Sequence, residues 1–331
     1  MKDILRELFE YKSLTKESAR ETLTKLANGE YNESQMAAFL TVFQMRSITV
    51  EELAGFRDAM LELCMRVDLD EFDAMDLCGT GGDGKDTFNI STLSSFIVAG
   101  AGQNVAKHGN NSVSSVCGSS NVLAHFGIEF TNDQDKLRKA IDHAGICFLH
   151  APLFHPAMKN VAPVRRDLGI KTFFNMLGPM VNPSFPKKQI VGVFSLELAR
   201  LYAYLYAQTD KDYMILHALD GYDEISLTSE FKCYTKKMES ILSPKDLGLG
   251  TYQQSDLHGG NTVEDAADIF LSILQGKGTQ AQKEVVTANA GMALYAANPE
   301  AGIDTAVAKA KESLDSGKAF GAFKKLVEMK Y

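Results

Sequence analysis

A run of glycines is the first feature of this sequence that could do chemistry. Residues 79–84 read Gly-Thr-Gly-Gly-Asp-Gly, with four glycines in six positions. Glycine loses the most backbone freedom on ordering and has no side chain to pack, so helices and strands disfavour such a run. A loop of this kind can turn its backbone N–H groups toward a bound anion. The alternative is a simple turn, since the segment matches neither a Walker loop nor the dinucleotide fingerprint.

Amide and hydroxyl side chains follow the glycines at the expected start of a helix. Asn89, Ser91 and Thr92 stand directly before an apolar run that begins at Leu93. A short apolar strand, 75–78, precedes the glycines. The order of strand, glycine loop and helix start is typical of a phosphate site.

A second polar stretch, 107–115, follows a predicted strand that ends at Ala106. It reads Lys-His-Gly-Asn-Asn-Ser-Val-Ser-Ser and has no hydrophobic period. It offers a cation, an imidazole, amides and hydroxyls to a ligand. Gly118 and Ser119 then begin another expected helix, and the first N–H groups of a helix are donors without an intrahelical partner.

Two pairs of charged residues add to this set. Arg165 and Arg166 lie in segment 155–171, and a guanidinium can bind a carboxylate through two parallel hydrogen bonds. Asp223 and Glu224 follow a predicted strand. Magnesium prefers one or two carboxylates together with water and phosphate oxygens, so this acidic pair could hold it. The alternative for the pair is a solvated turn.

The elements that must position these residues form two groups. Residues 1–67 read as successive helices, with capping-box patterns at Asn32 and Thr49. Short apolar strands then alternate with helices, which predicts βαβ units. The expected fold class is α/β, with a small all-helical domain plus a larger α/β domain that has a mostly parallel central sheet and flanking helices. Strands are expected at 75–78, 104–106, 145–149, 190–194 and 213–218, with ligands beyond their carboxyl ends, and packing helices at 263–331.

The composition of the chain argues against several classes of protein. The chain of 331 residues is 45% hydrophobic and 23% charged, with a formal net charge of -8. The acidic balance argues against a nucleic-acid partner, which needs a basic surface. Five scattered cysteines without C-x-x-C spacing argue against a disulfide framework and a zinc site. Because no signal peptide or membrane-spanning apolar run is recognisable, we expect a cytoplasmic protein without a membrane partner.

Taken in order, these motifs resemble those of anthranilate phosphoribosyltransferase, an enzyme of tryptophan biosynthesis. The matching segments are GTGGDG, NIST, KHGN with VSS, CGSSNVL, HPAMKNVAPVRRDLGIKTFFNMLGP and DGYDEISLT. The resemblance covers nearly the whole chain, and RRDLGIKTFFNMLGP is its most discriminating part. Pyrimidine nucleoside phosphorylases share the glycine loop and KHGN and are the nearest alternative. A non-catalytic, nucleic-acid-binding relative of the same fold is the second alternative.

The resemblance implies a domain division, an assembly and a reaction. The domains would be 1–70, with a contribution from about 160–185, and 71–331, in a homodimer joined through the helical domains. The amino group of anthranilate would attack C1 of phosphoribosyl pyrophosphate (PRPP) and displace pyrophosphate. This is the second step of tryptophan biosynthesis from chorismate. Magnesium is implied as the cofactor, as two ions bound with PRPP.

The resemblance also assigns residues to the two substrates. The metal ligands would be Ser91, Asp223 and Glu224. Anthranilate would contact Gly79 and Asn110, with its carboxylate on Arg165. The residues implied at PRPP are Gly79, Gly82, Asp83, Thr87, Asn89, Ser91, Thr92, Lys107, Ser115 and Ser119.

No catalytic residue is assigned. His108 is expected to border the anthranilate pocket, as a wall or hydrogen-bond partner in preference to a proton acceptor. An aryl amine attacks while neutral and loses its proton late, so a strong base is not required. Two positions depart from the family pattern. Asn111 stands where an arginine often follows KHGN, which removes a positive charge near the phosphates, and Asn121 stands where the family often has an acid.

Overall fold

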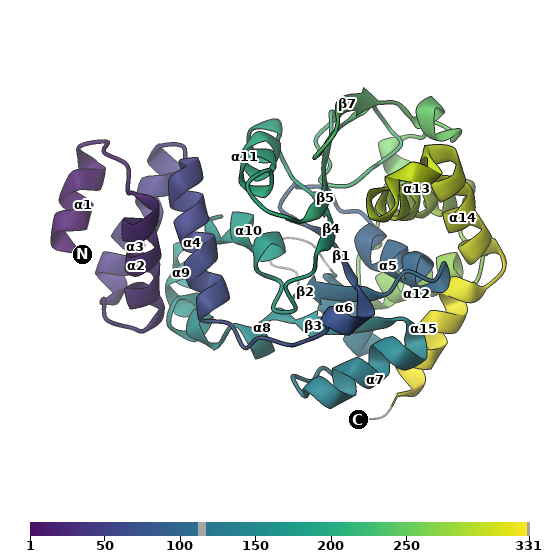
Figure 1. Ribbon diagram of the computed structural model, residues 1–331, viewed down its shortest axis with the longest axis horizontal. Helices are drawn as coiled ribbons and strands as arrows, with labels where there is room; N and C mark the ends of the chain where they lie inside the picture. Colours follow the sequence, from purple (N-terminus) through teal and green to yellow (C-terminus); the bar gives the residue numbers. More distant parts are fainter. Residues whose placement is uncertain (112–116, 330–331) are drawn as a thin grey trace. The chain divides into compact units, whose positions relative to one another are not determined.

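The computed structural model describes residues 1–111 and 117–329. The chain divides into two compact units, each built from two stretches of sequence (Figure 1). Met1–Arg66 and Ala151–Pro183 form the helical unit. Val67–His150 and Ser184–Tyr331 form the α/β unit, which contains every strand of the described residues.

The helical unit begins with four helices, and a capping side chain starts each of the last three. The capping boxes predicted at Asn32 and Thr49 are confirmed. Each side chain accepts the N–H of the residue three positions later, and the backbone N–H of Asn32 or Thr49 donates to that residue's side chain in return. The four helices are α1 (Lys2–Phe9), α2 (Lys16–Ala27), α3 (Glu33–Met45) and α4 (Val50–Glu62). The second stretch adds α8 (Ala151–Phe154), η2 (Pro156–Asn160), α9 (Ala162–Leu168), α10 (Phe174–Leu177) and η3 (Gly178–Val181).

An aromatic cluster joins the second stretch to the first four helices. Phe173 stacks on Phe56 of α4 with ring centroids 4.3 Å apart. Phe39 and Phe43 of α3 meet Phe173 edge-on, at 6.0 and 5.2 Å. Buried aromatic contacts of this kind contribute more than their area alone. Residues 151–183 are therefore part of the core of the helical unit.

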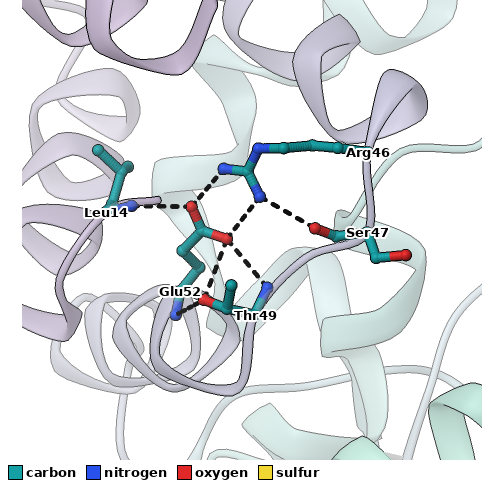
Figure 2. A network of polar contacts seen from close by, with 5 residues as sticks. All are labelled: Leu14, Arg46, Ser47, Thr49 and Glu52. Atoms are coloured by element: carbon teal, nitrogen blue, oxygen red, sulfur yellow. Dashed lines mark hydrogen bonds and ion pairs between the residues drawn. The ribbon is translucent and has the colours of Figure 1, made fainter. Parts of the chain in front are cut away.

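A buried carboxylate fixes the turn between α3 and α4. Glu52 is 0% exposed, and its two oxygens accept hydrogen bonds from both terminal nitrogens of Arg46, at 2.9 and 2.5 Å. They also accept the N–H groups of Leu14 and Thr49, both at 2.9 Å, as Figure 2 shows. A buried charge is tolerated only when it is paired and hydrogen-bonded in this way. Glu52 thus ties the connection after α1 to the start of α4.

The α/β unit is built on a sheet of seven strands in its described part, in the order β3-β2-β1-β4-β5-β6-β7. The first five run parallel, and β6 and β7 continue antiparallel. The strands are β1 (Met75–Gly79), β2 (Val105–Gly109), β3 (Ile146–His150), β4 (Lys188–Gly192), β5 (Asp212–Ala218), β6 (Phe231–Thr235) and β7 (Glu239–Leu242). The strand order reverses between β1 and β4. In open parallel sheets, ligands bind beyond the carboxyl ends of the strands at such a reversal.

Helices cover both faces of the sheet. The N-terminal end of α5 (Ile90–Gly100) follows the glycine loop, and α5 packs on β1 and on α13 (Gln280–Ala297). Figure 1 shows α11 (Leu196–Tyr206) across the strands from α13. The other helices of the unit are η1 (Asp70–Phe72), α6 (Ser119–His125), α7 (Gln134–Ala144), η4 (Pro244–Leu247), η5 (Gln254–Leu257), α12 (Val263–Leu274), η6 (Pro299–Ala301), α14 (Ile303–Asp315) and α15 (Lys318–Glu328). None of the helices described is long and apolar enough to cross a bilayer.

The expected fold class is confirmed, a helical part and an α/β part with a mostly parallel sheet and flanking helices. The prediction that the second strand ends at Ala106 is wrong, because β2 continues to Gly109. Lys107 and His108 are buried in it, at 2% and 6% exposure. The Lys107 ammonium donates to the backbone oxygen of Leu77, and the backbone N–H of His108 donates to Asp76, both in β1. Strands β6 and β7 were not predicted. Lys232 in β6 and Glu239 in the edge strand β7 interrupt the apolar pattern that predicts a strand.

Candidate active site

Two glycines face each other at the point where the strand order reverses. Gly79 ends β1, Gly192 ends β4, and the two are paired in register. A Cβ built on Gly79 would lie 2.4 Å from Oδ2 of Asp223, and one built on Gly192 would lie 1.4 Å from the backbone oxygen of Asp223. No side chain fits in either place. The absence of side chains on both strand ends is what lets the Asp223 loop lie over the edge of the sheet.

The carboxylates of Asp223 and Glu224 are held by backbone N–H groups of the glycine loop and of α5. The N–H of Gly81 donates to Asp223 Oδ2 at 2.7 Å, and the N–H of Ser91 donates to Glu224 Oε1 at 2.8 Å. Asp83 approaches from the glycine loop, where its Oδ2 accepts the N–H of Asp223 at 3.4 Å. The motifs at 79–92 and 223–224 therefore form one cluster, although more than a hundred residues separate them.

Negative charge accumulates in this cluster. Burial raises the pKa of Asp223 well above its ordinary value, and the charges of Glu224 and Asp83 raise it further. Burial and the charge of Asp83 raise the pKa of Glu224 to about 7, against the hydrogen bond from Ser91. A bound divalent cation would offset this repulsion. Hard carboxylate oxygens suit magnesium completed by water and phosphate oxygens. Within the described residues, no set of three or more His, Cys, Asp or Glu side chains is arranged to hold a metal ion by itself.

The glycine loop adopts conformations that favour glycine. Gly81, Gly82 and Gly84 have φ angles of 62°, 76° and 74°, in the left-handed region that other residues avoid. Asp83 also accepts the N–H of Lys85 at 3.0 Å through Oδ1, which closes a turn inside the loop. The loop is thus a shaped turn whose side chains and N–H groups lie beside the acidic pair.

The residues after the glycine loop connect it to two other segments. Thr87 forms an antiparallel bridge with His258, in the chain that precedes α12. Asn89 precedes α5 and donates its amide hydrogen to the backbone oxygen of Cys117 at 2.9 Å. Thr92, in the first turn of α5, is 1% exposed. Of the PRPP residues expected here, Ser91 therefore lies directly at the acidic pair, whereas Thr92 is buried.

Lys107 brings a cation to the same place. Its ammonium donates to the backbone oxygen of Leu77 at 2.5 Å and to the hydroxyl of Ser91 at 3.3 Å. Burial lowers the pKa of Lys107, and the neighbouring charges of Asp76 and Glu224 act in the opposite direction. The ammonium is therefore beneath the first turn of α5, within reach of the Ser91 hydroxyl.

The remaining predicted residues of the α/β unit lie along β2 and its continuation. The backbone N–H of His108 donates to Asp76 Oδ1 at 3.1 Å. The backbone oxygen of Asn110 accepts the Ser119 hydroxyl at 3.2 Å, so the start of α6 is fixed to the end of β2. Gly109 makes this approach possible, since a Cβ there would lie 2.5 Å from Ser119 Oγ. Ser115 lies outside the described residues.

Arg165 belongs to the helical unit, near the end of α9. Its guanidinium lies over the ring of Phe174, 5.2 Å from the centroid, and donates to Asn175 Oδ1 at 3.4 Å. Burial lowers the pKa of Arg165. Among the described residues, no carboxylate pairs with it, whereas the exposed Arg166 pairs with Asp167 at 3.8 Å. Arg165 is thus a half-buried cation that could accept a ligand carboxylate.

Comparison with known proteins decides the family. The description "Glycosyl transferase family, a/b domain" belongs to a sequence model that matches residues 71–320, and the corresponding helical bundle domain matches residues 2–64. The anthranilate phosphoribosyltransferase of Christiangramia forsetii is 60% identical over 332 aligned residues, which cover 99% of each chain. The chain belongs to the anthranilate phosphoribosyltransferase family.

Solved anthranilate phosphoribosyltransferases share this fold along almost the whole chain. The crystal structure of the Thermus thermophilus enzyme superposes with a TM-score of 0.91 at 32% identity and covers 98% of both chains. The Saccharomyces cerevisiae enzyme, in complex with PRPP and Mg, gives a TM-score of 0.90 at 26% identity and covers 98% of this chain and 96% of its own. The helical and α/β parts are therefore those of an anthranilate phosphoribosyltransferase.

Sequence reasoning missed some residues of this candidate site. The sequence places Gly192 only within a predicted strand. In the structure, the backbone oxygen of Asp223 lies where a side chain on Gly192 would stand. Gly259 was not singled out, although a Cβ there would lie 2.4 Å from the backbone oxygen of Thr87. Its N–H donates to Asp86 at 2.8 Å. The adjacent glycines at 259–260 were a possible signal for a close backbone approach.

Proposed function

We propose that this chain transfers the phosphoribosyl group of PRPP to the amino group of anthranilate. The products are N-(5-phosphoribosyl)anthranilate and pyrophosphate, in the second step of tryptophan biosynthesis from chorismate. The observation that carries the proposal is the seating of Asp223 and Glu224 among the N–H groups of Gly81 and Ser91, at the strand reversal. The full-length similarity to anthranilate phosphoribosyltransferases supports the choice of substrates.

The reaction places opposite demands on the two ends of the breaking bond. Pyrophosphate leaves with growing negative charge while C1 of the ribose becomes cationic, so the site must stabilise charge and hold the reactants in line. N–H groups of the glycine loop, the hydroxyl groups at the start of α5 and the Lys107 ammonium can meet the phosphates. We assign to PRPP the residues Gly79, Gly82, Asp83, Thr87, Asn89, Ser91, Thr92, Lys107, Ser115 and Ser119.

Magnesium explains why acidic side chains belong in a site for an anionic substrate. We propose that Ser91, Asp223 and Glu224 hold it, as two ions when PRPP is bound. The metal would neutralise charge on the leaving pyrophosphate. The two carboxylates bind the substrate only through the cation, and the buried Lys107 balances part of their charge from below. The Saccharomyces cerevisiae relative, solved with PRPP and Mg, supports this assignment.

Anthranilate needs a partner for its carboxylate and a place for its amine. We assign its carboxylate to Arg165, whose guanidinium has no acidic partner in the part of the chain that the structure describes. Gly79 and Asn110 would contact the same substrate. His108 would border the pocket as a wall or hydrogen-bond partner in preference to a proton acceptor, because the neutral aryl amine is the nucleophile and requires no strong base.

We propose a cytoplasmic homodimer joined through the helical domains. In each chain the helical domain would comprise residues 1–70 with about 160–185, and the PRPP domain residues 71–331. Phe9 and Tyr11 at the end of α1 and Met45 at the end of α3 are 63%, 77% and 75% exposed. Exposed large apolar side chains are typical of interaction surfaces. Light scattering should give twice the mass of the 36.3 kDa chain, and Phe9→Lys with Met45→Lys should reduce it. A wild-type mass of one chain would reject the dimer.

The function is tested by incubating the purified chain with anthranilate, PRPP and magnesium. Anthranilate fluorescence should fall, and N-(5-phosphoribosyl)anthranilate and pyrophosphate should appear in equal amounts. Uridine with inorganic phosphate is the control for a nucleoside phosphorylase. Phosphorolysis of uridine without consumption of anthranilate would replace our proposal by that activity.

A further inference from the structure

The loop that carries Asp223 and Glu224 is also held by α13, a helix that packs on β4 and β5. Ile225, the next residue, is 0% exposed, and its peptide groups face Asn289 of α13. The N–H of Ile225 donates to Asn289 Oδ1 at 3.0 Å, and Nδ2 of Asn289 donates to the oxygen of Ile225 at 2.8 Å. One side chain therefore satisfies both backbone groups of the residue that follows the acidic pair.

Asn289 is itself held in one orientation. Its Nδ2 also donates to the backbone oxygen of Val285 at 2.8 Å, one turn earlier in α13. Its amide oxygen faces a backbone donor and its amide nitrogen faces two backbone acceptors, so only one placement of the amide satisfies all three bonds. At 7% exposure, the side chain has little freedom to rotate. An Ala or Ser side chain at this position could not make all three hydrogen bonds.

Two supports thus set the position of the acidic pair. Gly79 and Gly192 leave room for Asp223 to lie on the strand ends. Asn289 fixes the backbone at Ile225. Between these supports, Gly81 and Ser91 donate to the carboxylates. A shift of the loop at Ile225 would withdraw both carboxylates from these donors together.

We propose that Asn289 is a positioning residue that aims the Asp223 and Glu224 carboxylates at the metal–pyrophosphate part of the substrate. The proposal rests on the function proposed above and assigns a role to α13, which lies far along the chain from every motif of the site. Asn289 touches neither substrate in this role. It acts through the Ile225 backbone, in the way that residues behind metal ligands orient them elsewhere.

The variants Asn289→Ala and Asn289→Asp separate positioning from simple packing. Ala removes all three hydrogen bonds, whereas Asp keeps the size of the side chain and the acceptor for the Ile225 N–H. Ser313→Ala is the matched control, since Ser313 is 0% exposed and donates to the Ile97 oxygen at 2.7 Å, in the packing of α14 on α5. It removes one buried hydrogen bond without touching the acidic loop.

Two measurements report on the acidic pair. The first is the magnesium concentration that gives half-maximal rate at saturating PRPP and anthranilate. The second needs no turnover: binding of Mn²⁺ in the presence of inorganic pyrophosphate, followed by loss of the free-ion electron paramagnetic resonance signal. Thermal unfolding by circular dichroism is recorded for each variant, so that loss of fold is recognised.

We expect Asn289→Ala to raise the half-maximal magnesium concentration and to weaken Mn²⁺ binding by about 10- to 100-fold, the usual effect of removing a residue that orients metal ligands. Asn289→Asp should shift both in the same direction, and it decides the case if the alanine variant does not fold. Ser313→Ala should lower the unfolding temperature and leave both metal measurements unchanged. Wild-type metal measurements in a folded Asn289 variant would overturn the role of Asn289. An inactive wild type that binds no Mn²⁺ would instead overturn the proposed function.

Discussion

The carboxylate of Asp223 lies where a side chain on Gly79 would begin. A Cβ on Gly79 would stand 2.4 Å from Asp223 Oδ2, closer than unbonded atoms can approach. The first residue of the glycine loop must therefore be glycine, because the Asp223 carboxylate, from another part of the chain, fills the space of a side chain.

The contact predicts the effect of Gly79→Ala. The added methyl group would displace the Asp223 carboxylate, and we expect kcat/KM for PRPP to fall by about 10-fold or more, with a higher magnesium requirement. Gly84→Ala is the control, because Gly84 has a φ of 74° and open space around its Cα. That variant should suffer only the modest cost of backbone strain. Equal magnesium requirements in the two variants would contradict the role of the contact.

Arg165→Ala should act mainly on anthranilate. It removes the half-buried guanidinium that we assign to the substrate carboxylate, so we expect KM for anthranilate to rise by about 10- to 100-fold, the value of a charge-assisted hydrogen bond. Steady-state kinetics with each substrate varied in turn will measure this. Arg166→Ala is the matched control, since that side chain is 80% exposed and pairs with Asp167. A larger change in KM for PRPP than for anthranilate would reject the assignment.

Gly259→Ala should weaken PRPP binding without touching the substrate. Its methyl group would push against the backbone oxygen of Thr87, which a Cβ would approach to 2.4 Å, and displace the bridge between Thr87 and His258. Small displacements of positioning groups are costly, and we expect KM for PRPP to rise by about 10-fold. Gly321→Ala, in α15 with nothing near its Cα, should leave PRPP kinetics unchanged. Unchanged kinetics in Gly259→Ala would mean that the bridge does not position the loop.

Much of this site could be predicted from the sequence, because its residues come after strands whose carboxyl ends meet at one edge of the sheet. The glycine loop, the start of α5 and the acidic pair all follow strands that alternate with helices, and carboxyl ends of parallel strands meet at one edge. Local patterns suffice to find such residues. The helical unit was equally accessible, because capping boxes and helical periods are local signals.

The rest of the site depends on contacts that local patterns do not contain. Nothing near Gly192 in the sequence indicates that Asp223 lies against it, because this requires the pairing of β1 with β4. Asn289 lies in a helix that we expected only to pack, and its partner Ile225 is 64 residues away. The buried Lys107 within β2 also interrupts the apolar pattern of a strand. Its burial is explained by the hydrogen bond from its ammonium to the backbone oxygen of Leu77, a contact that the local sequence does not show.

The buried Glu52 predicts a pH dependence of stability. Burial acts to raise its pKa, but hydrogen bonds from Arg46, Thr49 and Leu14 outweigh this and leave the pKa below its ordinary value of 4.5. The carboxylate therefore stabilises the fold fully above that ordinary value, and the contribution is lost as the pH falls through the lower pKa of the folded protein. Glu52→Gln should cost about 3 kcal/mol near neutral pH and less in acid.

Urea unfolding followed by circular dichroism will measure this dependence, at about pH 7 and about pH 3.5, on either side of the ordinary carboxyl pKa. Glu62→Gln is the matched control, because Glu62 pairs with Arg20 in a bridge whose side chains are 52% and 50% exposed. Exposed pairs contribute at most about 1 kcal/mol, so this variant should unfold almost like the wild type. A loss in Glu52→Gln that is the same at both pH values would show that the charge of Glu52 is not the source of its effect.

The central claim is that Asp223 and Glu224 bind PRPP through magnesium, on a platform made by the strand ends. Isothermal titration of PRPP into the protein, with and without magnesium, tests it most directly. We predict that the wild type binds PRPP tightly only with magnesium, and that Asp223→Asn with Glu224→Gln abolishes this dependence while the far-ultraviolet circular dichroism is unchanged. Equal, magnesium-dependent binding by the double variant would contradict the account and reduce the acidic pair to a turn.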